Sequence, residues 1–280
     1  MIDIVTVVFE QEIPVLRAQA QSIALNCQRI GIRNIYVVLN DTETIASQID
    51  PAWWGPLASN VLIIPRTAFS TPFVANGWVS QQVLKLLTAS VSYNTYSMIL
   101  DAKTLFVREL DPNTVIDATG RILTGRLPIY PVFEPSKKIV EQLFEIELTE
   151  QLGPGGVPFI VHNDTVRMMI AEVTLRTRTP FPTWFQQQGM VTEFILYSGF
   201  VKFLCGDLSV MYDRQSKLGG IINVSHDETV QWLTKINQMN KPQTLTVSVH
   251  RGAWNQLTAQ QRQEYQDLLL QRGIEAARDL

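Results

Sequence analysis

The sequence has few cysteines, little net charge and no long apolar run, and each shortage excludes a class of protein. Its two cysteines, Cys27 and Cys205, are too few and too far apart for a disulfide framework, which fits a reducing compartment. A formal net charge of −3, without a lysine- and arginine-rich block, does not favour nucleic acid or an anionic membrane as partner. The longest uncharged stretch, residues 67–84, is interrupted by Pro72 and by asparagine and glutamine, so it predicts no transmembrane segment.

Two further absences concern targeting and nucleotide binding. The chain begins with an apolar, β-branched segment and has no basic and apolar leader, so we predict no signal peptide and a cytoplasmic location. Neither G-x-G-x-x-G nor the P-loop pattern occurs, so any nucleotide must be held by other groups. The chain has 280 residues, of which 46% are apolar and 18% charged, and this composition suffices to bury one large core. The length predicts one large domain with appendages.

The first forty residues predict a strand, a helix and a second strand. Residues 2–9 are almost entirely apolar, which is typical of a strand buried on both faces. Pro14 can open a helix whose apolar residues recur at helical spacing, and Gly31 ends it. Residues 34–39 form the second strand, and this βαβ unit predicts an α/β domain with a mostly parallel sheet flanked by helices.

The stretch around Asp101 is the most informative part of the chain. Residues 96–100 predict a buried strand that ends at Asp101, and Lys103 follows two residues later. Ligands of open α/β sheets gather at the carboxyl ends of the strands, which makes Asp101 a candidate site residue. Aspartate also caps turns often, and the residues alone leave both interpretations open.

The preceding segment, residues 78–91, predicts a helix with a polar stripe. Trp78, Gln82 and Lys85 share one face at spacings of four and three residues. A helix lysine is ordinarily solvated, and this alternative stays open. Because the next strand ends at Asp101, the stripe is also a candidate for facing the site.

The second half of the chain predicts shorter elements. A helix over residues 192–203, capped by Thr192, would place Glu193 in its first turn, where the helix dipole favours a carboxylate. The other predictions are short strands and turns over 108–135, helices over 136–152 and 165–175, strands over 159–161, 221–225 and 244–249, and a terminal helix opened by a capping box at 258–261.

Neither a histidine metal site nor a serine or cysteine nucleophile is predicted. His162, His226 and His250 each follow a strand, but they are widely separated and lack the spacing of metal ligands. The G-x-S-x-G pattern of a nucleophile elbow does not occur.

Taken together, these features resemble the GT-A glycosyltransferases, single-domain enzymes of Rossmann-like topology. The resemblance is carried by the opening βαβ unit, the stretch LDAKTLFV, the helix WVSQQVLKL, the late helix TEFILYSGF and the segment VSVHRG. It implies a branch in which Asp-x-Lys replaces the usual Asp-x-Asp. It also implies one domain over residues 1–280, with a nucleotide-binding half (1–107), an acceptor-side half (108–257) and a C-terminal helix (258–280).

The resemblance implies that the protein transfers a sugar from a nucleotide-diphosphate donor to a glycan or small acceptor, with inversion, in polysaccharide biosynthesis. It implies that Asp101, Lys103 and Glu193 are catalytic, with Glu193 as the general base. A helix-opening glutamate stabilised by the dipole is the alternative for Glu193. The implied donor-binding residues are Val8, Phe9, Asn40, Trp78, Gln82, Lys85, Asp101, Lys103 and His250.

The Asp-x-Lys form bears on metal dependence. Metal-using members hold Mn²⁺ or Mg²⁺ with paired aspartates and often a late histidine. Asp101 matches the first aspartate, but Lys103 stands where the second belongs and would repel a dication. Either the metal is therefore absent or Lys103 swings away from it, with Asp101 and His250 as the ligands if Mn²⁺ or Mg²⁺ binds. We favour the form without a metal. Lys103, together with Lys85, would supply the positive charge, Asp101 would orient the ribose or sugar, and His250 would hydrogen-bond the diphosphate.

Two other functions remain open at this point. A non-catalytic nucleotide-sugar-binding or scaffold protein of the same fold is one, and Lys103 is the evidence for it. A sugar nucleotidyltransferase is the other, although such enzymes carry a glycine-rich basic loop after the first strand, where this chain has FEQEIP.

Overall fold

The computed structural model describes residues 1–41, 43–69, 77–153 and 157–280, and most of the proline-interrupted segment before Gly77 lies outside these ranges. The strands of its main sheet are β1 (Ile2–Val8), β2 (Ile32–Leu39), β3 (Val61–Pro65), β4 (Tyr96–Asp101) and β8 (Phe159–His162). They lie in the order β3-β2-β1-β4-β8, with β8 alone antiparallel to its neighbour. This mostly parallel sheet confirms the predicted fold class.

Two smaller sheets accompany the main one. Their strands are β5 (Leu105–Phe106), β9 (Gly220–Val224) and β10 (Thr244–Val249) in one sheet, and β6 (Arg126–Pro128) and β7 (Glu150–Leu152) in the other. β10 lies between β5 and β9, and β6 pairs with β7 in antiparallel fashion. Because β5 follows β4 directly, the C-terminal strands are joined to the end of β4, where the candidate site lies.

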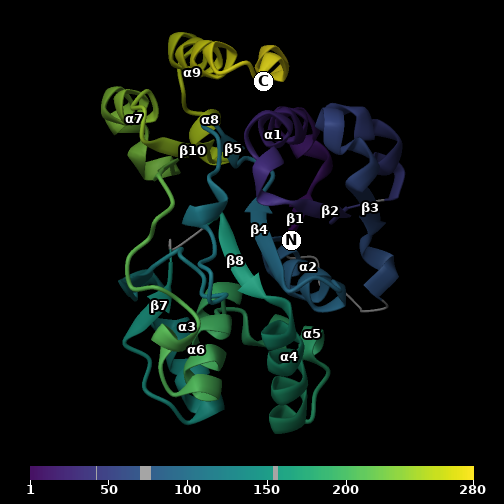
Figure 1. Ribbon diagram of the computed structural model, residues 1–280, viewed down its shortest axis with the longest axis vertical. Helices are drawn as coiled ribbons and strands as arrows, with labels where there is room; N and C mark the ends of the chain where they lie inside the picture. The colour runs from purple at the N-terminus through teal and green to yellow at the C-terminus, as the bar shows by residue number, and fades with distance from the viewer. Residues whose placement is uncertain (42, 70–76, 154–156) are drawn as a thin grey trace.

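Helices cover both faces of the main sheet. They are α1 (Ile13–Asn26), α2 (Gly77–Val91), α3 (Glu134–Phe144), α4 (Asn163–Thr177), α5 (Phe181–Gln188), α6 (Glu193–Cys205), α7 (Trp232–Met239), α8 (Arg251–Trp254) and α9 (Ala259–Gln271). Figure 1 shows α1 on one side of the strands and α2 on the other, with α3 to α6 beyond α2 and α7 to α9 on the side of α1.

The predicted βαβ unit is present, and its register sets the site. All residues of β1 are buried, as expected for a strand covered on both faces. Gly31 adopts the left-handed conformation (φ 68°), which lets the chain turn back into β2. Val7 of β1 lies beside Asp101 of β4, and Val8 lies beside Leu39 of β2. The carboxyl ends of three parallel strands therefore meet at one edge.

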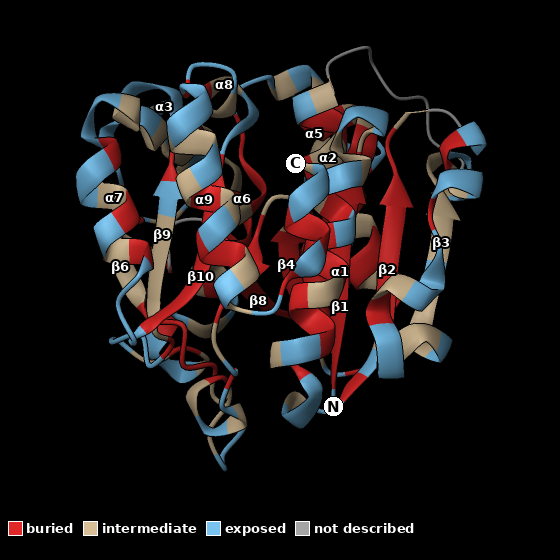
Figure 2. Ribbon diagram, turned by 90° about the horizontal axis from the view of Figure 1, so that it is seen from above, coloured by how far each residue is buried: buried red, intermediate tan, exposed pale blue. Residues whose placement is uncertain are grey.

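The C-terminal segment packs against α1 through an apolar cluster that is separate from the core around the main sheet. This cluster joins Ala18 of α1 and Leu105 of β5 to Tyr265 and Leu269 of α9. The predicted capping box is present at the start of α9, where Thr258 and Gln261 bond each other's backbone N–H groups. In Figure 2 β1, β2, β4 and the facing side of α1 are mostly buried, whereas β3 and β9 are mostly intermediate and the outer sides of α7 and α9 are exposed.

The helix predicted over residues 136–152 is wrong in its second half. α3 ends at Phe144, because Glu145 takes the left-handed conformation with φ 55°. Glutamate rarely does so, and neither glycine nor proline marks the turn in the sequence. Leu148 is then buried in a segment without regular secondary structure, and residues 150–152 pair with β6. Apolar residues that continue the helical spacing thus lie in a loop and a strand.

The late helix α6 begins at Glu193, but its predicted side-chain cap is wrong. Thr192 occupies the N-cap position, and its buried hydroxyl has no hydrogen-bond partner among the described residues. The Glu193 N–H instead donates to Oε1 of Gln82 on α2, at 3.0 Å. Of the helices in the described ranges, none is both long and apolar enough to span a bilayer.

Candidate functional site

The turn after β4 positions Asp101 and Lys103. The Thr104 N–H donates to the Asp101 carbonyl at 2.9 Å, which closes the turn. Nε2 of Gln19, a buried residue of α1, donates to the carbonyls of Asp101 (2.6 Å) and Thr104 (3.1 Å), and its Oε1 accepts from the Thr6 hydroxyl. The backbone of Asp101 therefore closes the turn. Its carboxylate accepts from no backbone N–H among the described residues, so the side-chain cap is absent there, and the carboxylate pairs with other groups.

Four charged side chains meet at this turn. Lys85 Nζ lies 2.7 Å from Oδ1 of Asp101 and 3.1 Å from Oε1 of Glu193. Lys103 Nζ lies 2.7 Å from Oδ2 of Asp101. Elements far apart in the sequence thus contribute two ammonium groups and two carboxylates, in which the charges alternate and balance. These four residues, Lys85, Asp101, Lys103 and Glu193, are called here the ion cluster.

The members of the ion cluster differ in how far their side chains are buried. The side chains of Lys85 and Glu193 are 4% and 6% exposed, whereas those of Asp101 and Lys103 are 24% and 25% exposed. The solvated-lysine interpretation of Lys85 is therefore wrong. An ammonium group this deeply buried is retained when carboxylates pair with it, and here it also lies 5.7 Å from the centre of the Phe194 ring.

The pKa shifts follow from these contacts. Burial opposes the charged form of Lys85, but Asp101 and Glu193 together outweigh it and raise the pKa of the ammonium group. Burial likewise opposes ionisation of Asp101, but Lys85 and Lys103 outweigh it and lower the pKa of that carboxyl. For Glu193 burial dominates over the attraction of Lys85, so its pKa is raised. Asp101 is thus the firmly ionised carboxylate of the cluster.

A pocket of about 310 Å³, called here the strand-end pocket, opens beside the exposed part of this cluster. Its lining consists of Val7, Phe9, Glu12, Gly77, Trp78, Gln81, Asp101, Ala102, Lys103, His250 and Arg251. Phe9, Trp78, Asp101, Lys103 and His250 were expected at a donor site, and the structure brings them together around this pocket.

Other expected donor-site residues do not line the strand-end pocket. Val8 is fully buried, because neighbouring strand residues point to opposite faces and Val7 takes the pocket side. Asn40 is buried and bonded to the Gly77 carbonyl (3.0 Å) and the Ser80 hydroxyl (2.7 Å). These residues shape the edge of the site from behind.

Gln82, Lys85 and Glu193 also lie behind the pocket wall. Gln82 joins α2 to the start of α6 through the Glu193 N–H, and Lys85 ties Asp101 to Glu193. None of the three is part of the pocket lining. In this arrangement Glu193 has no open path to a ligand in the pocket.

Two charged residues at the pocket were missed from the sequence. Arg251 follows His250 at the start of α8, and its Nη1 lies 2.5 Å from Oε1 of Gln11. Glu12 ends a short 3₁₀ helix after β1, and its Oε2 accepts from the Phe9 N–H at 3.2 Å. Arg251 could have been inferred from its place beside His250 in VSVHRG, whereas Glu12 carries no sequence signal that separates it from Glu10.

His250 lines the strand-end pocket, and its Nε2 has no hydrogen-bond partner among the described residues. Its Nδ1 accepts the Gly252 N–H at 3.1 Å, so the proton of the neutral ring lies on Nε2. Burial and the neighbouring Lys103 and Arg251 lower the pKa of this histidine. The neutral ring thus offers an N–H donor.

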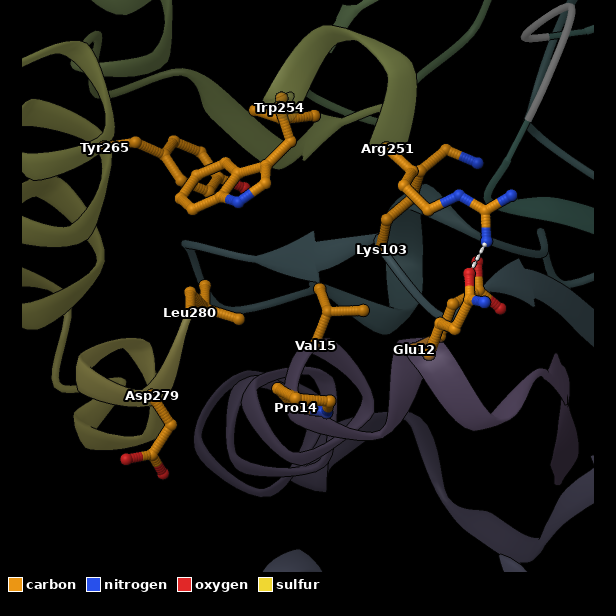
Figure 3. A pocket seen from close by; sticks show the side chains of 11 residues that line it. Glu12, Pro14, Val15, Lys103, Arg251, Trp254, Tyr265, Asp279 and Leu280 are labelled. Carbon is orange, nitrogen blue, oxygen red and sulfur yellow. Dashed lines mark hydrogen bonds between the residues drawn. The ribbon is translucent and has the colours of Figure 1, made fainter. Parts of the chain in front are cut away.

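A second pocket of about 200 Å³, called here the C-terminal pocket, adjoins the first. Its lining consists of Gln11, Glu12, Pro14, Val15, Lys103, Val249, Arg251, Trp254, Tyr265, Asp279 and Leu280. Glu12, Lys103 and Arg251 line both pockets. Figure 3 shows these three on one side of the C-terminal pocket, with Trp254, Tyr265 and Leu280 on the other.

The residues at the end of β4 do not fit a divalent cation such as Mn²⁺ or Mg²⁺. Both carboxylate oxygens of Asp101 lie 2.7 Å from a lysine ammonium group, and Lys103 occupies the position of a second carboxylate ligand. In the described part of the chain, no three histidine, cysteine, aspartate or glutamate side chains are grouped to hold a metal ion. His162 lies beside Tyr96 at the start of β4, far from His250, which borders the pocket at its end.

Comparison with solved structures defines the class of fold. The galactosyltransferase LgtC, solved in complex with donor and acceptor sugar analogs, matches with 10% identity over 96% of this chain and 95% of that chain, at a TM-score of 0.53. The glycosyltransferase GlyE of Streptococcus pneumoniae TIGR4 matches with 12% identity over 99% of this chain and 62% of that chain, at a TM-score of 0.48. At such identities the likeness to LgtC concerns the fold alone, and it confirms a GT-A-like α/β fold.

The family is also established. The chain belongs to DUF6492, a family of unknown function, whose model matches residues 18–254. A search of curated proteins finds no match.

Proposed function

We propose that the protein is a glycosyltransferase that moves a sugar from a nucleotide-diphosphate donor to a hydroxyl group of a glycan or small acceptor. The observation that carries this proposal is the strand-end pocket, where Lys103, His250 and Arg251 gather around the end of β4. The GT-A-like fold supports it, since LgtC in complex with donor and acceptor sugar analogs shares that fold.

The chemistry of sugar transfer accounts for this gathering of cations. When the bond between the sugar and the diphosphate breaks, negative charge develops on the leaving group, and fixed positive charge there lowers the barrier. Lys103 and Arg251 supply that charge, and the His250 Nε2–H donates a hydrogen bond to a phosphate oxygen. In this proposal these three side chains stabilise the charge of the leaving group, and no divalent cation is required for that purpose.

Asp101 and the groups behind it hold this arrangement. Asp101 fixes the Lys103 ammonium group at 2.7 Å, and its partly exposed carboxylate orients the ribose or sugar. Lys85 and Glu193 hold Asp101 from the buried side. Because Glu193 lines neither pocket, we propose a positioning role for it in place of the general-base role that the resemblance implies.

The division of the chain follows from the same proposal. Residues 1–107 supply the donor-binding half through β1, β4 and α2. Residues 258–280 close one side of the site by packing on α1. Residues 108–257 contribute His250 and Arg251 to the donor site, so this segment is not devoted to the acceptor alone.

Nucleotide binding is the first test. Isothermal titration of UDP, GDP and CMP, each with and without Mn²⁺, is expected to show that one nucleoside diphosphate binds with unchanged affinity when EDTA replaces the metal. Lys103→Met is expected to weaken that binding. Lys138→Met is the matched control, because Lys138 is an exposed lysine of α3 far from the pocket lining.

Sugar release from nucleotide sugars of the nucleotide that binds is the second test. Activity that survives EDTA supports the proposal, and activity abolished by EDTA would overturn its metal-free form. Tight nucleotide binding without sugar loss from any donor would favour a binding or scaffold protein. Formation of a sugar nucleotide from a sugar phosphate and a nucleoside triphosphate would favour a nucleotidyltransferase.

A further inference from the structure

The C-terminal pocket has two chemically different ends. Val15 and Pro14 of α1, Leu280, and the rings of Trp254 and Tyr265 form an apolar end. The ring centres of Trp254 and Tyr265 lie 6.1 Å apart in an edge-on arrangement, and the guanidinium of Arg262 lies over Trp254. Such an aromatic wall suits the apolar face of a sugar ring or an aryl group. The other end is charged and adjoins the strand-end pocket.

Glu12 stands where the two pockets join. It lines both of them, as do Lys103 and Arg251, whose positive charges act on its carboxylate. Its Oε2 accepts the Phe9 N–H, which fixes the side chain, while its Oε1 has no hydrogen-bond or ion-pair partner among the described residues. One carboxylate oxygen is therefore held, and the other is open to a ligand.

The other carboxylates near the pockets are engaged. Both oxygens of Asp101 lie 2.7 Å from lysines. Glu193 is buried against Lys85. Asp279, on the far side of the C-terminal pocket, forms an exposed ion pair with Arg17 at 2.6 Å. Glu12 is thus the carboxylate placed between the two pockets with an open oxygen.

We propose that the C-terminal pocket binds the acceptor, a hydroxyl compound with a pyranose or aryl ring that lies against Trp254, and that Glu12 is the catalytic base. This inference rests on the proposed sugar transfer. It puts the acceptor between α1, α8 and α9. The acceptor site therefore draws on the end of the segment 108–257, as the resemblance implies, and also on α1 and on residues 258–280.

The step balances as a single displacement. The acceptor oxygen forms a bond to the anomeric carbon of the donor while the bond from that carbon to the diphosphate oxygen breaks. Glu12 Oε1 takes the hydroxyl proton, and the electron pair of the broken bond leaves with the diphosphate toward Lys103 and Arg251. Burial raises the pKa of Glu12, which brings it closer to neutral pH and makes it a better proton acceptor.

Glu12→Gln tests the base, with Glu10→Gln as its control. Glu10 lies two residues away in the same short helix but is exposed and lines neither pocket. Glu12→Gln is expected to lower kcat by about 10²–10⁴-fold, to abolish the acidic limb of the pH profile, and to leave the Kd of the bound nucleotide within about twofold. A kcat above half of the original value in Glu12→Gln would overturn the inference.

Trp254 tests the acceptor pocket without any turnover. In saturation-transfer NMR, p-nitrophenyl glycosides are expected to bind in the presence of saturating nucleoside diphosphate. Trp254→Ala is expected to abolish the signal and Trp254→Phe to retain it. Because Trp254 packs against the C-terminal apolar cluster, thermal unfolding is measured to establish that both variants are folded at the temperature of the binding experiment. Displacement of the glycoside by the nucleotide would assign both pockets to the donor and overturn the inference.

The two proposals fail in different ways. If no nucleotide sugar is consumed by the unmodified protein, the proposed function falls and the base role falls with it. If sugar transfer is observed and Glu12→Gln transfers as fast as the unmodified protein, only the inference about Glu12 falls. If the aryl glycoside binds equally well to Trp254→Ala, the proposed acceptor pocket is refuted, whereas the proposed sugar transfer is not affected.

Discussion

Replacing Lys85 with methionine is expected to destabilise the protein by about 3–5 kcal/mol, the usual cost of breaking a buried ion pair from one side. Methionine retains the apolar stem but leaves Glu193 and Asp101 without the cation between them. Asp101 still pairs with Lys103 and is 24% exposed, so water and Lys103 compensate part of its loss. The Glu193 side chain is 6% exposed, and we expect most of the cost there.

Urea unfolding followed by circular dichroism at pH 7 measures this free energy of unfolding. Lys138→Met, on the exposed side of α3, is the control and is expected to stay within about 0.5 kcal/mol of the unmodified protein. The double variant Lys85→Met/Glu193→Gln removes the stranded carboxylate together with the cation. It is expected to recover most of the loss, because removing both partners costs less than leaving one buried and unpaired.

The pH dependence follows from the same contacts. Because Asp101 and Glu193 raise the pKa of Lys85, the folded protein keeps this proton at a pH where the unfolded chain has released it. The contribution of Lys85 is therefore fully present below the unfolded pKa of about 10.4 and is lost as the pH rises above it. The stability difference between the unmodified protein and Lys85→Met should narrow from pH 9 to pH 11. A loss below about 1 kcal/mol at pH 7 is typical of a solvated pair and would refute the buried ion cluster.

Three further predictions concern other parts of the molecule. If the protein transfers sugars as proposed, Lys103→Met is expected to lower kcat by about 10²–10³-fold, as for loss of one charge-stabilising donor. Unchanged steady-state kinetics would remove Lys103 from the proposed leaving-group site. Burial raises the pKa of Glu12, so the ionised carboxylate opposes folding at a pH above the pKa of the unfolded chain. In urea unfolding, Glu12→Gln should therefore be more stable relative to the unmodified protein at pH 8 than at pH 4. An equal difference at both pH values would contradict the raised pKa. Gly199→Ala would bring its Cβ into a clash with Cγ1 of Val140, so thermal unfolding should show about 1–3 kcal/mol of destabilisation that Val140→Ala relieves. Full stability of the single variant would mean that α3 and α6 pack less closely.

The first half of the fold could be predicted because its signals are local. The apolar runs that form β1, β2 and β4 are largely buried on both faces of a parallel sheet, and the helical spacing of α1 and α2 marks the helices that cover it. The position of Asp101 at a strand end followed from the same pattern. The end of α3 could not be predicted in this way, because Glu145 turns the chain without glycine and the apolar spacing continues into β7.

The candidate site was only partly accessible from sequence. Asp101 was predicted because it stands where a buried strand ends, whereas Lys103 and His250 were implied by the resemblance to the GT-A glycosyltransferases. His250 follows β10, which belongs to a different sheet from β4. The sequence could not show that Lys85 is buried, since an amphipathic helix places lysine on a solvated or a packed face with the same spacing. Only the folded chain brings Glu12 and Arg251, 239 positions apart, to the same pocket wall. Periodicity records which residues are buried within an element, whereas the meeting of charges from distant elements depends on how the layers pack.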